Sequence, residues 1–117
     1  MTEQHRTLIV ARADRRSLAD IGRIFAESDD TGLPHRLGVR RRSLFHFREL
    51  YFHLIDADAP VLGPLEQMRD DPDFRSVNER LARFVTPYSP EWRSPGDAMA
   101  NEFYTWSSGE CPWEGER

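Results

Sequence analysis

The chain has 117 residues, and all 16 of its basic side chains are arginine, because lysine is absent. Without a lysine amine the protein can form no Schiff base with a carbonyl compound and carries no phosphate-loop lysine. Twenty acidic residues outweigh the arginines and give a formal charge of −4 at pH 7. Such a protein does not as a whole attract nucleic acid or an anionic membrane surface, so neither is expected as a partner.

The length predicts a single domain with one core, since a chain of this size buries about two thirds of its unfolded surface. Only 38% of the residues are hydrophobic, and we expect a second copy to cover part of the apolar surface. Cys111 is the single cysteine, so no intrachain disulfide can form, which is typical of a cytoplasmic protein. The short apolar run at residues 8–11 predicts neither a signal peptide nor a membrane span.

The first elements are predicted to be a strand and an amphipathic helix. Residues 6–13 form a nearly continuous apolar run, as in a strand buried on both faces. Ser17 occupies the position of a helix N-cap, with Asp20 three residues later, and apolar residues recur at helical spacing up to about Glu27. The helix is expected to end before Gly32.

An antiparallel hairpin is predicted next. Residues 39–47 alternate in polarity and residues 50–56 form a second β-rich run, with only Arg48 and Glu49 between them. A two-residue turn fixes which residues pair, and paired residues share one face of a sheet, whereas a longer turn would shift the register. One face of the hairpin therefore gathers Arg42, Leu44, His46, Tyr51, His53 and Ile55, with Arg40 at its far end.

The remaining chain predicts two helical stretches, a loop and a last strand. Residues 61–68 predict a short helix, and a second helical stretch starts at Pro72. Residues 86–97 contain three prolines and predict an ordered loop, and the aromatic-rich residues 98–106 predict the last strand. The tail at residues 107–117 is expected to be mobile.

The predicted order of elements is strand, helix, strand, strand, helix, strand. This is the split β-α-β arrangement of a ferredoxin-like α+β domain, which we assign to residues 1–106. Helices then cover one face of a four-stranded sheet. Pairing of the open face with that of a second subunit would hide its apolar side chains.

Arg40, Arg41 and Arg42 form the densest basic run and are candidates for holding an anion such as a carboxylate or a developing enolate. Alternation along the strand sends Arg41 to the opposite face from Arg40 and Arg42. A solvated or acid-paired strand end is the alternative for Arg40 and Arg41. Arg42 lies beside two histidines, and the sequence favours a functional role and a structural role for it equally.

Three histidines are candidates for chemistry. His53 lies mid-strand among apolar neighbours, where a core histidine with a satisfied hydrogen bond is the usual alternative to a functional one. His53 and His46 lack a third ligand at a recognisable spacing, so no metal site is predicted. His35 lies in an expected loop, from which it could cap or gate a pocket.

An aspartate and two aromatic residues complete the candidates. Asp29 stands near the predicted helix C-terminus, where a carboxylate opposes the helix dipole. This position indicates either a compensating partner or a turn-forming role. Tyr51 and Trp106 either line an aromatic pocket or belong to the core.

Six blocks stand in order at characteristic spacing, namely Arg6-Thr-Leu-Ile-Val-Ala-Arg, Phe25-Ala-Glu-Ser-Asp, Leu33-Pro-His, Gly38-Val-Arg-Arg-Arg-Ser-Leu-Phe, Leu50-Tyr-Phe-His-Leu-Ile, and Pro90-Glu-Trp with Asp97-Ala-Met-Ala-Asn-Glu-Phe-Tyr-Thr-Trp. Through these blocks the chain resembles the small aromatic polyketide cyclases of type II polyketide synthesis. The resemblance implies a homodimeric α+β barrel that acts in the cytoplasm without a cofactor. The implied partners are an aromatic polyketide intermediate and other polyketide synthase subunits.

The resemblance also implies a reaction, the closure of a late ring on a partly cyclised polyketide by intramolecular aldol condensation and loss of water. The positions implicated in the family correspond to Asp29, Arg42 and His53, which are expected to orient the substrate or His53, to stabilise the enolate or carbonyl, and to transfer protons. The chain has serine at position 28, where a member of the family has histidine. The expected substrate contacts are Ser28, His35, Arg40, Tyr51 and Trp106.

Little catalytic power is needed for this reaction. A methylene between two carbonyls is acidic, so a modest base and a donor to the enolate oxygen suffice, and positioning decides which ring forms. The site therefore either performs acid and base chemistry or only folds the substrate into register. Two other functions stay open, a cofactor-free monooxygenase that oxidises an anthrone and a non-catalytic accessory subunit of a polyketide synthase.

Overall fold

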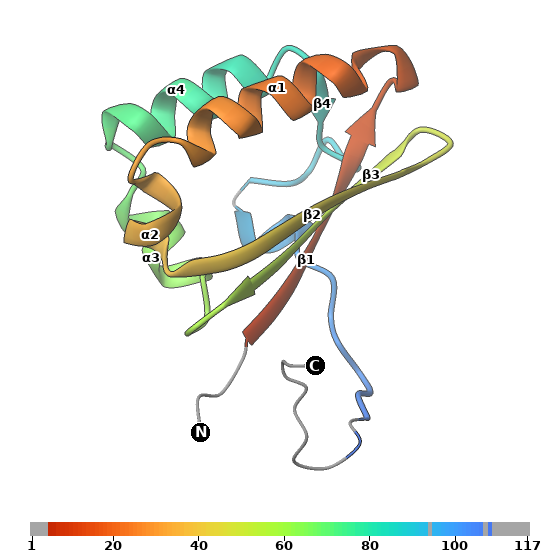
Figure 1. Ribbon diagram of the computed structural model, residues 1–117. Helices are drawn as coiled ribbons and strands as arrows, with labels where there is room; N and C mark the ends of the chain where they lie inside the picture. Colours follow the sequence, from red (N-terminus) through yellow and green to blue (C-terminus); the bar gives the residue numbers. More distant parts are fainter. Residues whose placement is uncertain (1–4, 94, 107, 109–117) are drawn as a thin grey trace.

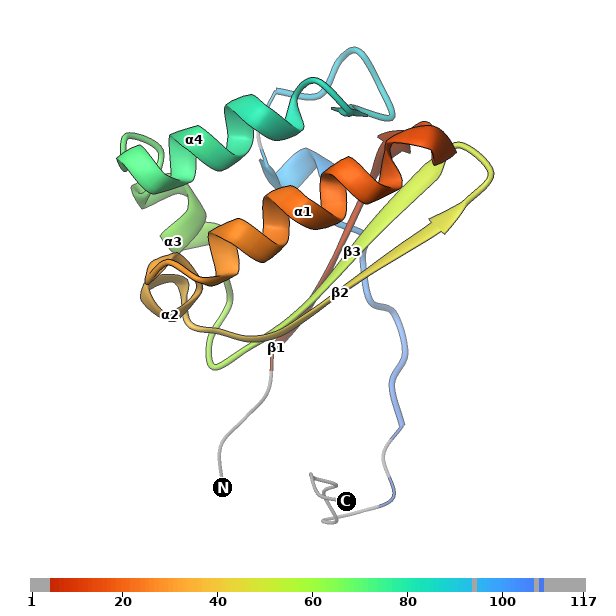
Figure 2. The ribbon, with the colours of Figure 1, turned by 45° about the horizontal axis from the view of Figure 1, so that its top comes forward.

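The computed structural model describes residues 5–93, 95–106 and 108 and has two layers, a four-stranded antiparallel sheet and helices on one face of it (Figure 1). The sheet order is β2-β3-β1-β4, with strands β1 (His5–Ala13), β2 (Val39–Phe47), β3 (Leu50–Ala57) and β4 (Val85–Thr86). The helices are α1 (Leu18–Asp29), α2 (Leu33–Leu37), α3 (Leu62–Gln67) and α4 (Pro72–Leu81), with 3₁₀ turns η1 (Arg15–Ser17) and η2 (Pro95–Ala98). Strong strand twist curls the sheet beneath α1 (Figure 2). The predicted α+β class is confirmed.

The predicted hairpin and its register are confirmed. Phe47 pairs with Leu50 across the two-residue turn, and Leu44 pairs with His53 further along. Arg48 adopts a φ of 58°, the left-handed conformation that two-residue hairpin turns commonly require. In this register, His53 and the residues that share its face of the hairpin lie on the side of the sheet that the helices cover. This side is here called the inner face.

The sequence predicts the last strand at residues 98–106, and this prediction is wrong. The fourth strand is the much shorter β4, which pairs with the end of β1. Within residues 98–106, Met99 forms an isolated bridge to β1 and the chain then leaves the sheet. Aromatic residues favour strands because they pack on a half-buried surface, but Phe103 is 92% exposed and Trp106 is 74% exposed. The tail at residues 107–117 lies outside the described residues, apart from one position.

Helix α1 starts where predicted but is capped differently. Ser17 precedes its first residue and makes no capping hydrogen bond through its side chain. Asp14 instead caps the preceding 3₁₀ turn, and its carboxylate accepts from the backbone N–H of Arg16 at 2.7 Å. At its other end the helix continues to Asp29, which places this carboxylate in the last turn.

Helices α1 and α4 lie side by side over the inner face (Figures 1 and 2). Ile21 and Phe25 of α1 pack with Ala11, Ala13 and Tyr51 of the sheet in one buried cluster. The opposite, outer face of the sheet carries the apolar side chains of Leu8, Val10, Phe45, Phe47, Leu50, Phe52 and Leu54.

Gly38 joins α2 to β2 with a φ of 78°, a left-handed conformation that disfavours any residue with a Cβ atom. We expect Gly38→Ala to lower the free energy of unfolding by roughly 1–2 kcal/mol, measured by urea denaturation. Gly63→Ala in α3 is the matched control, because an added Cβ meets no atom within 4 Å there, and it should be neutral or slightly stabilising. Equal losses in the two variants would contradict this explanation.

Candidate active site

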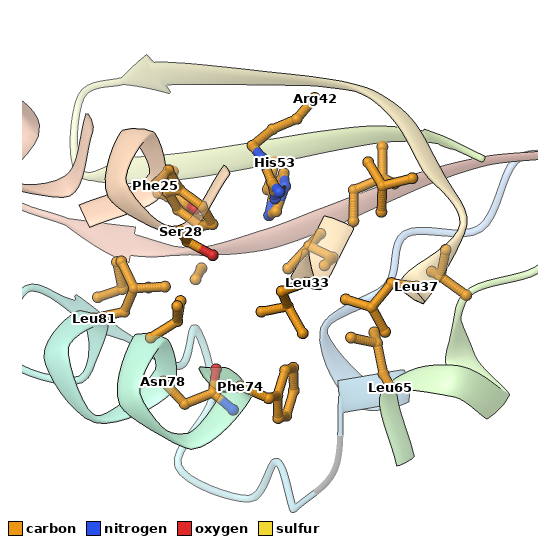
Figure 3. Close-up of a pocket in the computed structure, with 18 of the residues that line it drawn as sticks. Phe25, Ser28, Leu33, Leu37, Arg42, His53, Leu65, Phe74, Asn78 and Leu81 are labelled. Atoms are coloured by element: carbon orange, nitrogen blue, oxygen red, sulfur yellow. Dashed lines mark hydrogen bonds between the residues drawn. The ribbon is translucent and has the colours of Figure 1, made fainter. Parts of the chain in front are cut away.

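A cavity of about 390 Å³ lies between the inner face of the sheet and the helices (Figure 3). Strands β1, β2 and β3 form one wall, and helices α1 to α4 form the others. The lining is mostly apolar, with the few polar side chains of Ser28, Arg42, Tyr51, His53 and Asn78. An apolar cavity with a few convergent polar groups is the usual form of a site for a small organic molecule.

Arg42 projects from β2 onto the cavity wall and is held by Asp29 at the end of α1. Its Nη2 donates to Oδ1 of Asp29 at 2.7 Å and its Nε donates to Oδ2 at 3.3 Å. The Arg42 side chain is only 15% exposed, whereas that of Asp29 is 42% exposed. The carboxylate at the helix C-terminus thus has the compensating partner that the sequence indicates as one alternative, and the ion pair joins the helix layer to the sheet.

The third nitrogen of the Arg42 guanidinium binds His53 of β3. Nη1 lies 3.0 Å from Nε2 of His53. Because a guanidinium can only donate, Nε2 must accept, so the imidazole is neutral and carries its proton on Nδ1. Burial first, and the charge of Arg42 second, lower the pKa of His53 to about 3. His53 therefore has a buried hydrogen bond, as a core histidine would, and also faces the cavity.

The Nδ1 atom of His53 is the one that a bound molecule can reach. Within the described residues, no hydrogen bond engages Nδ1. The one side-chain polar atom there that is both fully buried and without a hydrogen bond is Oδ1 of Asp56, so Nδ1 is not fully buried. Nδ1 is therefore accessible from the cavity. The site offers a neutral N–H donor there, with a permanent cation directly behind it.

Phe25 of α1 contacts both members of this pair, although it was not among the candidate site residues predicted from the sequence. Its ring centroid lies 5.1 Å from that of His53 in an edge-to-face arrangement and 4.8 Å from the guanidinium carbon of Arg42. Figure 3 shows Phe25 and His53 facing each other on the cavity wall. Its spacing of four residues from Asp29 is the signal that could have identified it, since residues i and i+4 share a helix face.

Ser28 and Tyr51 lie on the cavity wall, where the sequence analysis expects substrate contacts. Burial raises the pKa of the Tyr51 hydroxyl, while the charge of Arg42 acts in the opposite direction. Tyr51 therefore stays neutral and serves as a donor or acceptor. Asn78 of α4 was not predicted, although it stands four residues after Phe74 on the helix face that lines the cavity.

Three expected substrate-binding residues lie away from the cavity. His35 is an exposed residue of helix α2 rather than of a loop. Arg40 is exposed and pairs with Asp58 at 3.2 Å, because a β-bulge between Val39 and Arg41 interrupts the alternation that would have aligned it with Arg42. Trp106 is 74% exposed and is not among the residues that line the cavity. Within one chain, the structure therefore does not bring these three residues to the site.

The described part of the chain contains no cluster of three or more His, Cys, Asp or Glu side chains that could hold a metal ion. No helix in it is long and apolar enough to cross a membrane. The polar groups on the cavity wall are one charged guanidinium, one neutral imidazole and a few neutral side chains.

Comparison with known proteins points to one family. Residues 5–107 match the family model described as polyketide synthesis cyclase. Tetracenomycin F2 cyclase of Streptomyces glaucescens is 43% identical, in an alignment that covers 89% of this chain and 95% of that protein. Polyketide synthase CurG of Streptomyces cyaneus is also 43% identical, over 87% of this chain and 96% of that protein.

The fold agrees with the sequence match. The solved structure of tetracenomycin F2 cyclase, described as a type-II polyketide cyclase, superposes with a TM-score of 0.85 and covers 89% of this chain and 98% of that one. The similarity thus extends over most of both chains. On the family match, the identities and the shared fold together, this chain belongs to the polyketide synthesis cyclase family.

Proposed function

We propose that the protein is an aromatic polyketide cyclase that closes a late ring of a partly cyclised polyketide by intramolecular aldol condensation and loss of water. The observation that carries the proposal is the buried Arg42–His53 pair on the wall of an apolar cavity, in a chain of this family. The names of the relatives, a tetracenomycin F2 cyclase and a polyketide synthase, support the same class of substrate.

The apolar walls bind and fold the substrate. They exclude water from a flat, fused-ring intermediate and hold its flexible remainder close to the reacting carbonyl, which converts the ring closure into a reaction of preorganised groups. The acidic methylene between two carbonyls first loses a proton to water, and the enolate carbon that results forms a C–C bond to the carbonyl carbon. The carbonyl oxygen then takes a proton, and the resulting hydroxyl leaves as water together with a proton from the neighbouring carbon.

Arg42 and His53 stabilise the oxygen on which negative charge develops. The guanidinium supplies a positive charge that no proton transfer can remove, and the Nδ1–H of His53 donates a hydrogen bond into the cavity. Asp29 orients Arg42 through the two hydrogen bonds that it accepts. Because the pKa of His53 is far below its ordinary value, the imidazole is a weak base, and its role is that of a donor in its neutral form.

A reconstituted pathway tests this function. The protein is added to a minimal type II polyketide synthase with the enzymes that form the first rings, and the products are compared by mass spectrometry and NMR. A cyclase shifts the product from shunt compounds to one further ring and consumes no oxygen. Oxygen uptake with a reduced anthrone would favour a monooxygenase, and an unchanged product profile would contradict the cyclase.

Arg42→Met should lower kcat for ring closure by about 100-fold, the order expected when one stabilising donor to a developing oxyanion is lost. Arg42→Lys should recover little of the activity, because an ammonium cannot bind Asp29 and His53 with the same fork geometry. Arg23→Met is the matched control, since Arg23 lies on the exposed side of α1 and pairs with Asp20. A fully active Arg42→Met variant that remains folded would remove Arg42 from the mechanism.

The pKa of His53 predicts a pH dependence of stability. Between pH 6.5 and about 3 the unfolded chain binds a proton at this histidine while the folded chain does not, so the free energy of unfolding falls as the pH is lowered through this window. The slope contributed by His53 is at most about 1.4 kcal/mol per pH unit. Urea unfolding at several pH values measures it, with His53→Asn giving the background of the other groups. NMR titration of His53 near pH 6.5 would contradict the prediction.

We further propose that two copies form a homodimer, a ferredoxin-like α+β barrel in which the outer faces of the two sheets meet. The strand order β2-β3-β1-β4 supports a half-barrel of this kind. Phe45 is 54% exposed and Phe47 is 60% exposed on the apolar outer face. Large apolar side chains that are exposed together on one face are typical of an interface.

The double variant Phe45→Glu, Phe47→Glu should be a folded monomer, because four like charges would face one another across the proposed interface. Sedimentation equilibrium measures the mass, and circular dichroism verifies the fold. Arg15→Glu changes the charge at an exposed site away from the outer face and should leave the dimer intact. A monomeric unmodified protein, or a dimeric double variant, would contradict this arrangement.

A further inference from the structure

We propose that Phe25 is a positioning residue for ring closure, because its ring holds Arg42 and His53 in the single arrangement in which both serve the cavity. The inference rests on the proposed cyclase function. Three contacts close a triangle, namely Phe25 with Arg42 at 4.8 Å, Phe25 with His53 at 5.1 Å, and Arg42 with His53 at 3.0 Å. The Tyr51 ring also lies edge-on to His53, at 6.5 Å between centroids, but within the described residues only Phe25 also places its ring against the guanidinium of Arg42.

Two side chains of helix α1 contact Arg42. Phe25 and Asp29 are four residues apart and lie on one face of the helix. The carboxylate of Asp29 binds Nε and Nη2 of Arg42, while the ring of Phe25 contacts the guanidinium carbon. This division leaves Nη1 for His53, so the helix sets both the position of the cation and the direction in which it donates.

An aromatic ring suits this position because its π-face attracts the cation. Unlike a carboxylate, it does not take up the guanidinium N–H groups in strong hydrogen bonds. The π-face carries partial negative charge, and yet every strong acceptor around Arg42 remains either Asp29 or His53. A second carboxylate in place of the ring would neutralise the charge that the enolate oxygen requires. Phe25 is only 7% exposed, so its contact with Arg42 is shielded from water.

The same ring constrains His53. The edge-to-face contact fixes the orientation of the imidazole, and the burial to which Phe25 contributes keeps it neutral. With Arg42 donating to Nε2, the proton stays on Nδ1, which is the nitrogen that reaches the cavity. Loss of the ring would loosen both groups together, although neither would lose its direct hydrogen-bond partner.

The test compares Phe25→Leu and Phe25→Met with the conservative variant Phe25→Tyr. The two aliphatic variants should lower kcat by about 10- to 100-fold, the scale of a misplacement of roughly 1 Å, with KM changed much less. In ¹H–¹⁵N NMR spectra of the free protein, the His53 ring should lose its single Nδ1–H form and titrate at higher pH. Phe25→Tyr keeps the ring and should restore kcat and the NMR signals.

Ile24→Val is the matched control, since Ile24 is equally buried on α1 but does not line the cavity. Variants at Phe25 that melt at a lower temperature than the unmodified protein but keep kcat and the His53 signals would show a purely structural role and overturn the proposal. If the unmodified protein closes no ring, the cyclase function fails instead. The His53 spectra of the folded variants then decide by themselves whether Phe25 positions the pair.

Discussion

The guanidinium of Arg42 is the group on which the arrangement of the site depends. A largely buried cation must be paired and hydrogen-bonded, and here a carboxylate from α1 and an imidazole from β3 satisfy it while an aromatic ring covers it. These contacts join the helix layer to the sheet at the cavity wall. They also explain why a carboxylate is tolerated at the end of α1 and why a histidine in the core is neutral.

The two layers of the fold serve this interaction in different ways. Side chains of α1 pack against β1 and β3 in a buried cluster, and the cavity lies between the sheet and the four helices. The apolar cavity walls exclude water from around the guanidinium of Arg42, whose side chain is 15% exposed, and this strengthens its electrostatic interaction with a bound molecule. Since lysine is absent, the positive charge comes from arginine, which does not deprotonate and does not form covalent intermediates with carbonyl groups.

Local sequence patterns predicted the hairpin correctly and wrongly predicted a strand at residues 98–106. The two-residue turn at Arg48 fixed the register, and alternation then placed Arg42 and His53 on one face. The same alternation failed for Arg40, because a β-bulge depends on how two strands fit together and leaves no mark in the pattern. At residues 98–106 aromatic residues suggested a strand, but strand formation depends on a surface to pack against, and Phe103, Tyr104 and Trp106 are all exposed.

The sequence by itself determined the α+β class, the hairpin register, the family resemblance and the candidacy of Asp29, Arg42 and His53, since all of these follow from spacing or from short ordered blocks. Only the tertiary structure decided that Arg42 binds Asp29 and His53 at once, that Nδ1 of His53 is the nitrogen facing the cavity, and that Phe25 contacts both groups. The physical reason is that spacing identifies the face on which a side chain lies. Hydrogen-bond direction, burial and the resulting pKa depend on how the faces of α1, β2 and β3 come together.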